Sequence, residues 1–279
     1  MKQSDNDRNH PVKAYENLEF LNSPDARSIR VLCELMQPRI PFRNLNVHNT
    51  VVFFGSARTL PYKQAAAKLR ESEIIIAETE NPAHELFDLK RQAETNVKMS
   101  RYYEEAASLA EKITAWSMEI QEPHKRFFIC SGGGPGIMEA ANLGAKKAGG
   151  KSIGLNISLP YEQEPNPFQT PSLSFEFHYF FIRKFWFFYL AKAMVVFPGG
   201  YGTLDEFFEL LTLVQTEKTK KYMPIILYGQ DYWKRVLNFE AMVEYGTISP
   251  EDLNLFTIMD DVDSAFEHIK RELTEHHLG

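Results

Sequence analysis

The sequence predicts an α/β fold of the Rossmann-like, doubly wound type, with a mostly parallel sheet of about seven strands flanked by helices. Short apolar runs bounded by glycine or proline recur along the chain, which is typical of buried parallel strands. Segments with helical spacing of apolar residues separate most of these runs, as in repeated strand–helix–strand units. The chain has 279 residues, 44% of them hydrophobic, which is enough to build the core of one large domain.

The elements can be placed in order along the chain. Residues 1–48 contain several prolines and one expected helix, and we interpret them as an N-terminal extension packed on the domain or on a partner subunit. Residues 49–279 are expected to form a single Rossmann-like nucleotide-binding catalytic domain. Its strands are predicted, from their apolar runs, at residues 50–58, 126–131, 152–158, 173–178, 193–198, 223–229 and 255–260.

Helical patterns fill most of the intervals between these strands. A helical insert covers about residues 60–118, in which 63–69 and 102–118 carry good helix formers. The polar segment between them, 77–96, is either an insertion or the break between two helices. The helix that follows the second strand is expected to stop at the Gly149–Gly150 pair.

Composition excludes several classes of function. The net charge of −6 and the pI near 5.8 argue against a general nucleic-acid or membrane binder. No apolar run reaches the roughly 18 residues needed to span a bilayer, and the polar N-terminus does not resemble a signal peptide. We therefore expect a cytoplasmic protein, with Cys33 and Cys130 as buried, reduced thiols and with no metal or cofactor.

Small residues follow the carboxyl ends of three expected strands. In open α/β sheets ligands bind at this edge, glycine lets the backbone approach them closely, and a following helix offers N–H groups to an anion. We therefore predict a phosphate-ester site. Neither helix-linked loop matches the dinucleotide or P-loop pattern, which disfavours nicotinamide cofactors and ATP chemistry. The residues are Gly55 and Ser56; Gly132, Gly133, Gly134 and Gly136; and Gly199, Gly200, Gly202 and Thr203.

Charged residues close to these loops are the candidates for chemistry. Glu206 either closes a capping box with Thr203 or points into the site for acid–base or charge-stabilising work, while Asp205 is expected to lie to the side in solvent. Arg183 and Lys184 interrupt an aromatic helix. Either both extend to the surface, or Arg183 faces the site and pairs with a phosphate or with Glu206.

The helix after the first glycine-rich loop adds two candidates. Glu139 contacts the ribose or base, or it is a solvated first-turn acid favoured by the helix dipole. Met138 is a wall of the site or part of the core. From the helical insert, Arg101 with Tyr102 and Tyr103 could reach the site, although most such arginines are solvated.

Three of these segments together resemble one known family, LONELY GUY (LOG), whose members are also labelled possible lysine decarboxylases. The segments are SGGGPGIMEAAN, the Arg183–Lys184 pair and PGGYGTLDE. The family motif PGGxGTxxE is matched in full from Pro198 to Glu206, and the resemblance covers about residues 48–230. The N-terminal extension and the helical insert resemble the longer bacterial branch of the family.

The resemblance implies hydrolysis of the N-glycosidic bond of a nucleoside 5′-monophosphate, giving a free base and ribose 5-phosphate. The substrate would be a purine nucleotide such as AMP or a cytokinin riboside monophosphate, and the enzyme a homodimer or larger homo-oligomer. Arg183 and Glu206 correspond to the family's catalytic residues, and the glycines with Thr203 would hold the phosphate. We add Met138, Glu139 and Lys184 as candidates for substrate binding.

Two other functions were weighed against this one. A non-catalytic carrier of a nucleotide or phosphorylated cofactor, such as molybdenum cofactor, would use similar loops. The presence of both Arg183 and Glu206 favours the enzyme, because a carrier has little need of a carboxylate beside an anion. Lysine decarboxylation requires a lysine bound to pyridoxal phosphate, and no lysine stands out for that role.

Overall fold

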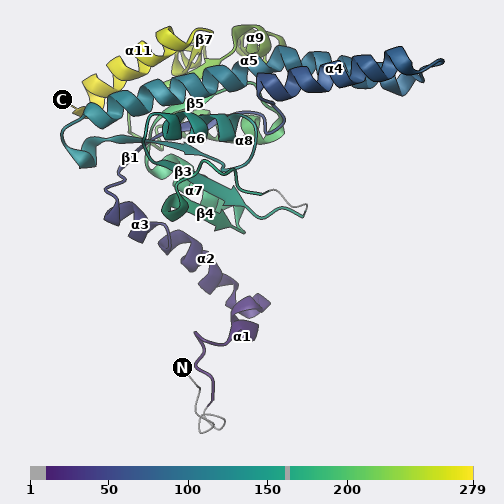
Figure 1. The fold of residues 1–279 in the computed structure, drawn as a ribbon. Coiled ribbons are helices and arrows are strands. Elements are labelled where there is room, and N and C mark those ends of the chain that lie inside the picture. Colours follow the sequence, from purple (N-terminus) through teal and green to yellow (C-terminus); the bar gives the residue numbers. More distant parts are fainter. Residues whose placement is uncertain (1–10, 161–163, 279) are drawn as a thin grey trace.

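A computed structural model describes residues 11–160 and 164–278. In these residues seven strands form one parallel sheet in the order β4-β3-β2-β1-β5-β6-β7 (Figure 1). Each predicted strand is present, and the predicted α/β class is confirmed. The strands are β1 (Asn49–Phe54), β2 (Phe127–Ser131), β3 (Ser152–Ile157), β4 (Ser174–Phe177), β5 (Ala191–Val196), β6 (Ile225–Tyr228) and β7 (Thr257–Met259).

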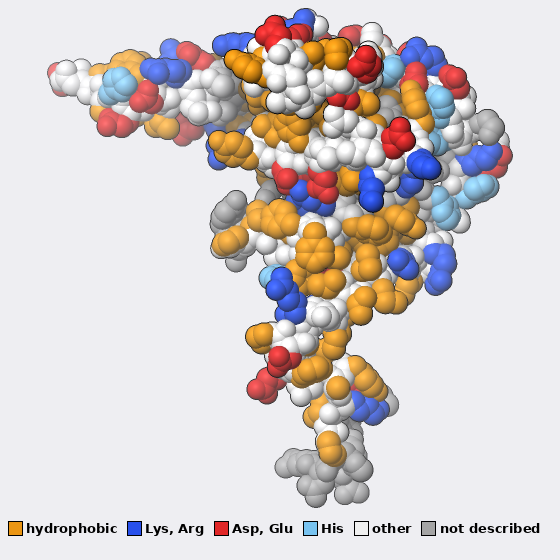
Figure 2. Space-filling view, turned by 180° about the vertical axis from the view of Figure 1, so that it is seen from behind, with side chains coloured by type: hydrophobic (Ala, Val, Ile, Leu, Met, Phe, Trp, Pro, Cys, Tyr) orange, Lys and Arg blue, Asp and Glu red, His pale blue; other side chains and the backbone are white. Residues whose placement is uncertain are grey.

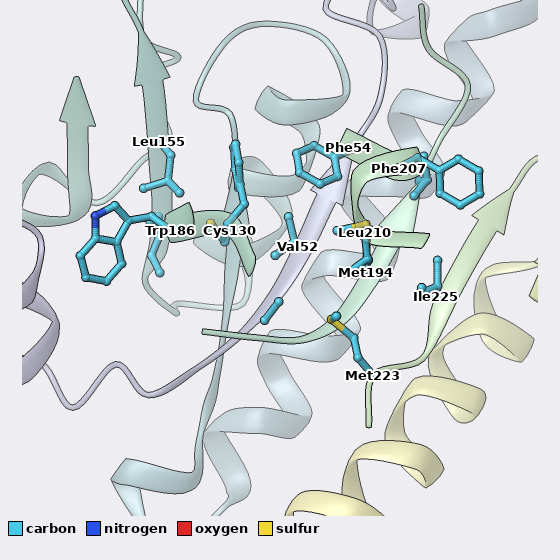
Figure 3. Close-up of a cluster of buried hydrophobic side chains, with 14 of the residues drawn as sticks. Val52, Phe54, Cys130, Leu155, Trp186, Met194, Phe207, Leu210, Met223 and Ile225 are labelled. Atoms are coloured by element: carbon cyan, nitrogen blue, oxygen red, sulfur yellow. The ribbon is translucent and has the colours of Figure 1, made fainter. Parts of the chain in front are cut away.

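Both faces of the central strands are buried, which explains why these strands are mostly apolar, whereas the edge strand β4 exposes Glu176. Val51 and Phe53 of β1 belong to one core and Val52 and Phe54 to the other, because successive side chains of a strand point to opposite faces. The first core lies under α5, α6 and α11, and the second under α7, α8, α9 and α10. Figure 3 shows part of the second core, which includes Phe54 of β1 and Phe207 of α8.

The helices of the body have the following bounds. The longer ones are α4 (Tyr62–Glu78), α5 (His84–Glu119), α6 (Ile137–Lys147), α7 (Phe180–Tyr189), α8 (Tyr201–Gln215), α9 (Gln230–Val236), α10 (Phe239–Glu244) and α11 (Val262–Leu273). Single-turn segments are η2 (Pro123–Lys125), η3 (Pro171–Leu173), η4 (Pro250–Leu255) and η5 (Thr274–Leu278). As predicted, α6 ends before the Gly149–Gly150 pair, where Gly149 has a φ of +76°.

The helical insert is a hairpin of α4 and α5 that projects from the body (Figure 1). Of the two alternatives for residues 77–96, the structure shows a break between two helices. The first helix ends at Glu78, the chain turns around Pro82, and one helix of 36 residues begins at His84. In the projecting half of α5 few side chains are buried, whereas from Tyr102 onward the helix packs on the sheet.

The N-terminal extension leads away from the body as an arm of α1 (Leu18–Asn22), η1 (Pro24–Ala26), α2 (Arg27–Met36) and α3 (Arg39–Asn44) (Figure 1). The carboxylate of Glu34 joins α2 to the body, accepting hydrogen bonds from the N–H groups of His178 (2.8 Å) and Tyr179 (3.2 Å) at the start of α7. The expectation that both thiols are buried is wrong for Cys33, which is exposed because α2 buries none of its residues; Cys130 is buried.

Candidate functional site

The order of the strands reverses between β1 and β5, and ligands of open α/β sheets bind in the crevice beyond this point. The glycine-containing loops meet there. The N–H of Ser56 donates to the carbonyl of Pro198 (2.9 Å), and the N–H of Ile137 donates to the carbonyl of Ser56 (3.1 Å). The loop after β1 is therefore held between the loops after β2 and β5, as the sequence predicted for a shared edge.

Buried amide side chains fix the loop after β2, where Gly133 and Gly136 have φ values of +76° and +72°. Asn166 donates to the carbonyls of Gly133 (2.9 Å) and Gly134 (3.0 Å), and Gln169 donates to that of Gly133 (2.6 Å). The sequence analysis missed both amides. In the sequence, Asn166 and Gln169 appear only as polar residues of the loop that precedes β4. Nothing in their neighbouring residues indicates that they are buried.

The loop after β5 leads into an open helix terminus. Gly200 is the N-cap of α8, and the first intrahelical bond runs from the N–H of Leu204 to the carbonyl of Gly200. The preceding N–H groups therefore have no intrahelical partner. A Cβ added at Gly200 or Gly202 would meet no heavy atom within 4 Å, and neither residue has a positive φ. Packing and backbone conformation do not require glycine at these two positions, so its role there is to leave space.

The two helix termini at this edge differ in charge. The first turn of α6 carries Glu139, whereas the first turn of α8 carries no acidic residue. A first-turn carboxylate offsets the positive end of the helix dipole. Of the two termini, that of α8 is the better match for a phosphate.

Arg183 of α7 and Glu206 of α8 form a buried ion pair, with 3.2 Å between Arg183 Nη2 and Glu206 Oε1. Their exposed fractions are only 8% and 5%. The guanidinium lies 5.1 Å from the ring centroid of Phe180 and 5.5 Å from that of Phe187, and its Nε is buried without a partner among the described residues. The surface alternative is therefore wrong for Arg183, and Nε is an unsatisfied buried donor in this structure.

The environment of the pair changes its acid–base behaviour. Burial raises the pKa of Glu206 to about 7, against the opposing attraction of Arg183, and burial also lowers the pKa of the Arg183 guanidinium. The carboxyl group of Glu206 is thus poised to gain or lose a proton near neutral pH, as acid–base catalysis requires.

This shift predicts a specific dependence of stability on pH. Because the pKa of Glu206 is raised above its ordinary value, the folded state binds more protons than the unfolded state between pH 4.5 and about 7, and stability falls as pH rises through that window. From pH 5 to pH 8, the free energy of unfolding of the native chain, taken relative to that of Glu206→Gln, should drop by about 2–3 kcal/mol. Urea denaturation of both proteins at the two pH values measures this difference, and parallel pH dependences would contradict it.

The capping-box alternative for Glu206 does not hold. Helix α8 begins at Tyr201, so Thr203 lies inside its first turn, and no side chain caps this terminus. Thr203 is buried, and its side chain packs where a Cβ on Gly199 would lie, 2.1 Å from Oγ1. Tyr232 of α9, which the sequence analysis did not single out, donates to the carbonyl of Gly199 (2.7 Å) and supports this loop.

Lys184 and Asp205 lie to the side of the Arg183–Glu206 pair. The Lys184 ammonium is 2.7 Å from a carboxylate oxygen of Asp205 and 2.7 Å from one of Glu209. Asp205 is exposed, as expected. The assignment of Lys184 to substrate binding stays a prediction, and in this structure its charge is directed to the outer face of α8.

Consecutive residues of α5 contact the same edge of the sheet. Arg101 Nη2 donates to Asp260 after β7 (2.7 Å), Tyr103 donates to Glu139 of α6 (2.6 Å), and Glu104 accepts from the N–H of Tyr62 (3.1 Å). Tyr102 packs on Gly229 after β6, where an added Cβ would lie 2.8 Å from its ring. Arg101 is thus held by Asp260, and Tyr103 is the member of this group that reaches a candidate site residue.

Among the described residues, no group of three or more His, Cys, Asp or Glu side chains could hold a metal ion. No helix in the described part of the chain is both long and apolar enough to cross a bilayer.

The fold and the site define a class: a Rossmann-like α/β protein with a buried Arg–Glu pair near the crevice of its sheet. Residues 138–269 match the protein-family model described as "Possible lysine decarboxylase". This match covers just under half of the chain, and it confirms the resemblance inferred from the motifs. No curated protein matched the chain in a direct search.

Solved structures with low identity to the chain were also found. The X-ray structure of TM1055, a structural genomics target, is 18% identical, covers 80% of this chain and 99% of its own, and has a TM-score of 0.44. Two structures of the molybdenum cofactor carrier protein from Chlamydomonas reinhardtii are 21% and 17% identical. They cover 62% and 81% of this chain and 89% and 98% of their own, with TM-scores of 0.39 and 0.42.

Proposed function

We propose that the protein hydrolyses the N-glycosidic bond of a purine nucleoside 5′-monophosphate, such as AMP or a cytokinin riboside monophosphate, to a free base and ribose 5-phosphate. The observation that carries this proposal is the Glu206 carboxyl group, buried against Arg183 and shifted to a pKa of about 7, on the same helix as an open, glycine-lined N-terminus. A phosphate-binding terminus and an acid–base group then lie about one and a half turns apart.

In this mechanism the N–H groups at the start of α8 bind the 5′-phosphate. Cleavage of the bond between C1′ and the base nitrogen leaves its electron pair on the base and builds positive charge on the ribose. The ionised carboxylate of Glu206 stabilises that charge and takes a proton from the water that attacks C1′. Arg183 orients the carboxylate and uses guanidinium donors that Glu206 does not occupy on the substrate, so that phosphate and sugar are held in one pose.

The open space at Gly202 predicts effects of opposite sign on stability and on binding. Gly202→Ala should raise the free energy of unfolding by up to about 1 kcal/mol, because alanine favours helix and nothing obstructs its Cβ. The same methyl group points toward the helix terminus and should raise the KM for AMP about tenfold by crowding the phosphate. Thermal melts and steady-state kinetics test the two effects, and an unchanged KM would place the phosphate elsewhere.

The proposed reaction is tested by incubating the purified chain with a panel of nucleoside 5′-monophosphates and measuring free base by chromatography. Adenine released from AMP but not from adenosine would support both the bond cleaved and the need for phosphate. The Glu206→Gln variant, purified in the same way, controls for contaminating nucleosidases. Binding of nucleotides without release of any base would reject the enzyme and leave the carrier function.

We also propose that the protein is a cytoplasmic homo-oligomer with α7 at its subunit interface. Aromatic side chains of this helix are exposed although it packs on the core, and Figure 2 shows hydrophobic side chains gathered where the arm meets the body. The exposed members are Phe180, Phe181, Phe185 and Tyr189. Light scattering on the purified chain, with Phe181→Ser as the variant that weakens the interface, tests this point; a monomeric native chain contradicts it.

A further inference from the structure

Tyr103 and Glu139 form a hydrogen bond that joins the helical insert to the first turn of α6. The hydroxyl of Tyr103 lies 2.6 Å from Glu139 Oε1, and Tyr103 is only 3% exposed. Burial and the adjacent carboxylate raise the pKa of this hydroxyl, so it remains a proton donor at any pH at which the protein works. Tyr103 can therefore only donate to Glu139, and the bond holds the carboxylate in one orientation.

The position of the Tyr103 hydroxyl is itself fixed by its neighbours on α5. Arg101 binds Asp260 after β7, and Glu104 binds the N–H of Tyr62 in the chain after β1. The ring of Tyr102 packs on Gly229 after β6. The helix is thus attached to several loops at the carboxyl edge of the sheet, and Tyr103 projects from this fixed segment.

Glu139 lies in the first turn of α6, next to Met138. Its neighbour Met138 packs against the loop after β2, where a Cβ on Gly132 would lie 2.7 Å from the methionine sulfur and 3.9 Å from the ring of Phe187. The same Phe187 ring lies against the Arg183 guanidinium. Met138 of the first turn of α6 and Phe187 beside Arg183 therefore approach the same glycine of the loop after β2.

The chemistry of Glu139 suits a sugar better than a phosphate. A carboxylate repels an anion but accepts hydrogen bonds from two adjacent hydroxyl groups. In dinucleotide-binding Rossmann folds an acidic residue after the second strand of the unit binds the ribose hydroxyl. Here neither β2, which ends at Ser131 before Gly132, nor β3, which ends at Ile157 before Ser158, is followed by an acid, whereas the helix after β2 carries Glu139 in its first turn.

We propose that Tyr103 is a positioning residue that orients Glu139 to accept hydrogen bonds from the 2′- and 3′-hydroxyls of the substrate ribose, so that the site favours ribonucleotides over 2′-deoxyribonucleotides. This inference rests on the proposed function, because it assumes a nucleotide in the site. It assigns to the helical insert a role in substrate selection.

The test measures the dissociation constants of AMP and 2′-deoxy-AMP by calorimetry on the full chain, in a Glu206→Gln background that stops turnover. Tyr103→Phe should reduce the preference for AMP over 2′-deoxy-AMP about tenfold, mainly by weakening AMP. Glu139→Ala should reduce it at least as much, and adding Tyr103→Phe to Glu139→Ala should have no further effect. The matched control is Tyr102→Phe, which removes a hydroxyl from the next residue of the same helix and should leave the preference unchanged.

The outcomes separate this inference from the proposed reaction. The inference is overturned if Tyr103→Phe leaves the preference for AMP unchanged. It is also overturned if Tyr103→Phe changes this preference equally in the presence of Glu139 and in the Glu139→Ala variant. Either result counts even if the native chain hydrolyses AMP. A different outcome is that the chain binds nucleotides, with the expected loss of preference in the variants, while the native chain releases no base. That result would reject the hydrolase and keep the ribose-binding role. Failure to bind either nucleotide would reject both.

Discussion

Glu206→Gln is expected to lower kcat/KM for AMP by about 10³-fold, which is the loss seen when a single preorganised charge-stabilising group is removed from an active site. Glutamine keeps the volume of the side chain and an oxygen that Arg183 can bind, so the local packing of α7 and α8 is retained. What it removes is the negative charge and the ability to take a proton from water. Initial rates of adenine release, measured over a range of AMP concentrations, give the comparison.

The pH dependence of the native enzyme supplies the second part of this prediction. Because burial raises the pKa of Glu206 to about 7, the ionised form is the minor one in acid. The value of kcat/KM should rise about tenfold per pH unit below pH 7 and level off above it. The residual activity of Glu206→Gln should not show this rise of kcat/KM below pH 7 (the acid limb of the pH profile). A native profile that falls through pH 7 would instead make Glu206 a general acid.

Substitution of Arg183 should have an effect of similar size with a different signature. Arg183→Gln removes the cation that opposes the raised pKa of Glu206, so the acid limb of the profile should move to higher pH by at least about one unit. It also removes the unpartnered Nε donor, and kcat/KM at the new plateau should fall about 10²- to 10³-fold.

Arg183→Lys is the matched control for charge. It keeps a cation beside Glu206, so the acid limb of its pH profile should stay near pH 7. Its activity should still fall, because an ammonium cannot reproduce the planar donor set of the guanidinium. Circular dichroism melts at pH 6, where an unpaired Glu206 can remain protonated, establish that both variants are folded. Equal limbs in the two variants would show that Arg183 does not influence the ionisation of Glu206.

The parts of the fold that depend on neighbouring residues were predictable. The apolar run of β5, the glycines that follow it and the helix formers of α8 each carry their signal within a few residues. The strands and the loops at their ends were therefore located from the sequence. The break near Pro82 was recognised as one of two alternatives, since a polar segment between helices looks the same whether it is a loop or the start of a solvent-exposed helix.

The errors and omissions involve contacts between distant segments. Cys33 has apolar neighbours in sequence, but it lies on the side of α2 that does not pack on the body. Asn166 and Gln169 were missed because their hydrogen bonds reach back to the loop after β2, across more than thirty residues. A polar side chain in a loop carries no local mark of such a partner.

The sequence by itself determined the class of fold, the edge of the sheet at which a ligand is expected, and the candidates Arg183 and Glu206, because glycine, charge and apolar periodicity are local properties. Only the tertiary structure decided what each charged group faces. It pairs Arg183 with Glu206 across 23 residues, turns Lys184 toward Asp205 and Glu209, and joins Tyr103 to Glu139 across 36 residues. The physical reason is that the ionisation and orientation of a side chain depend on burial and on partners in space, and the packing of α5, α7 and α8 on one sheet sets both.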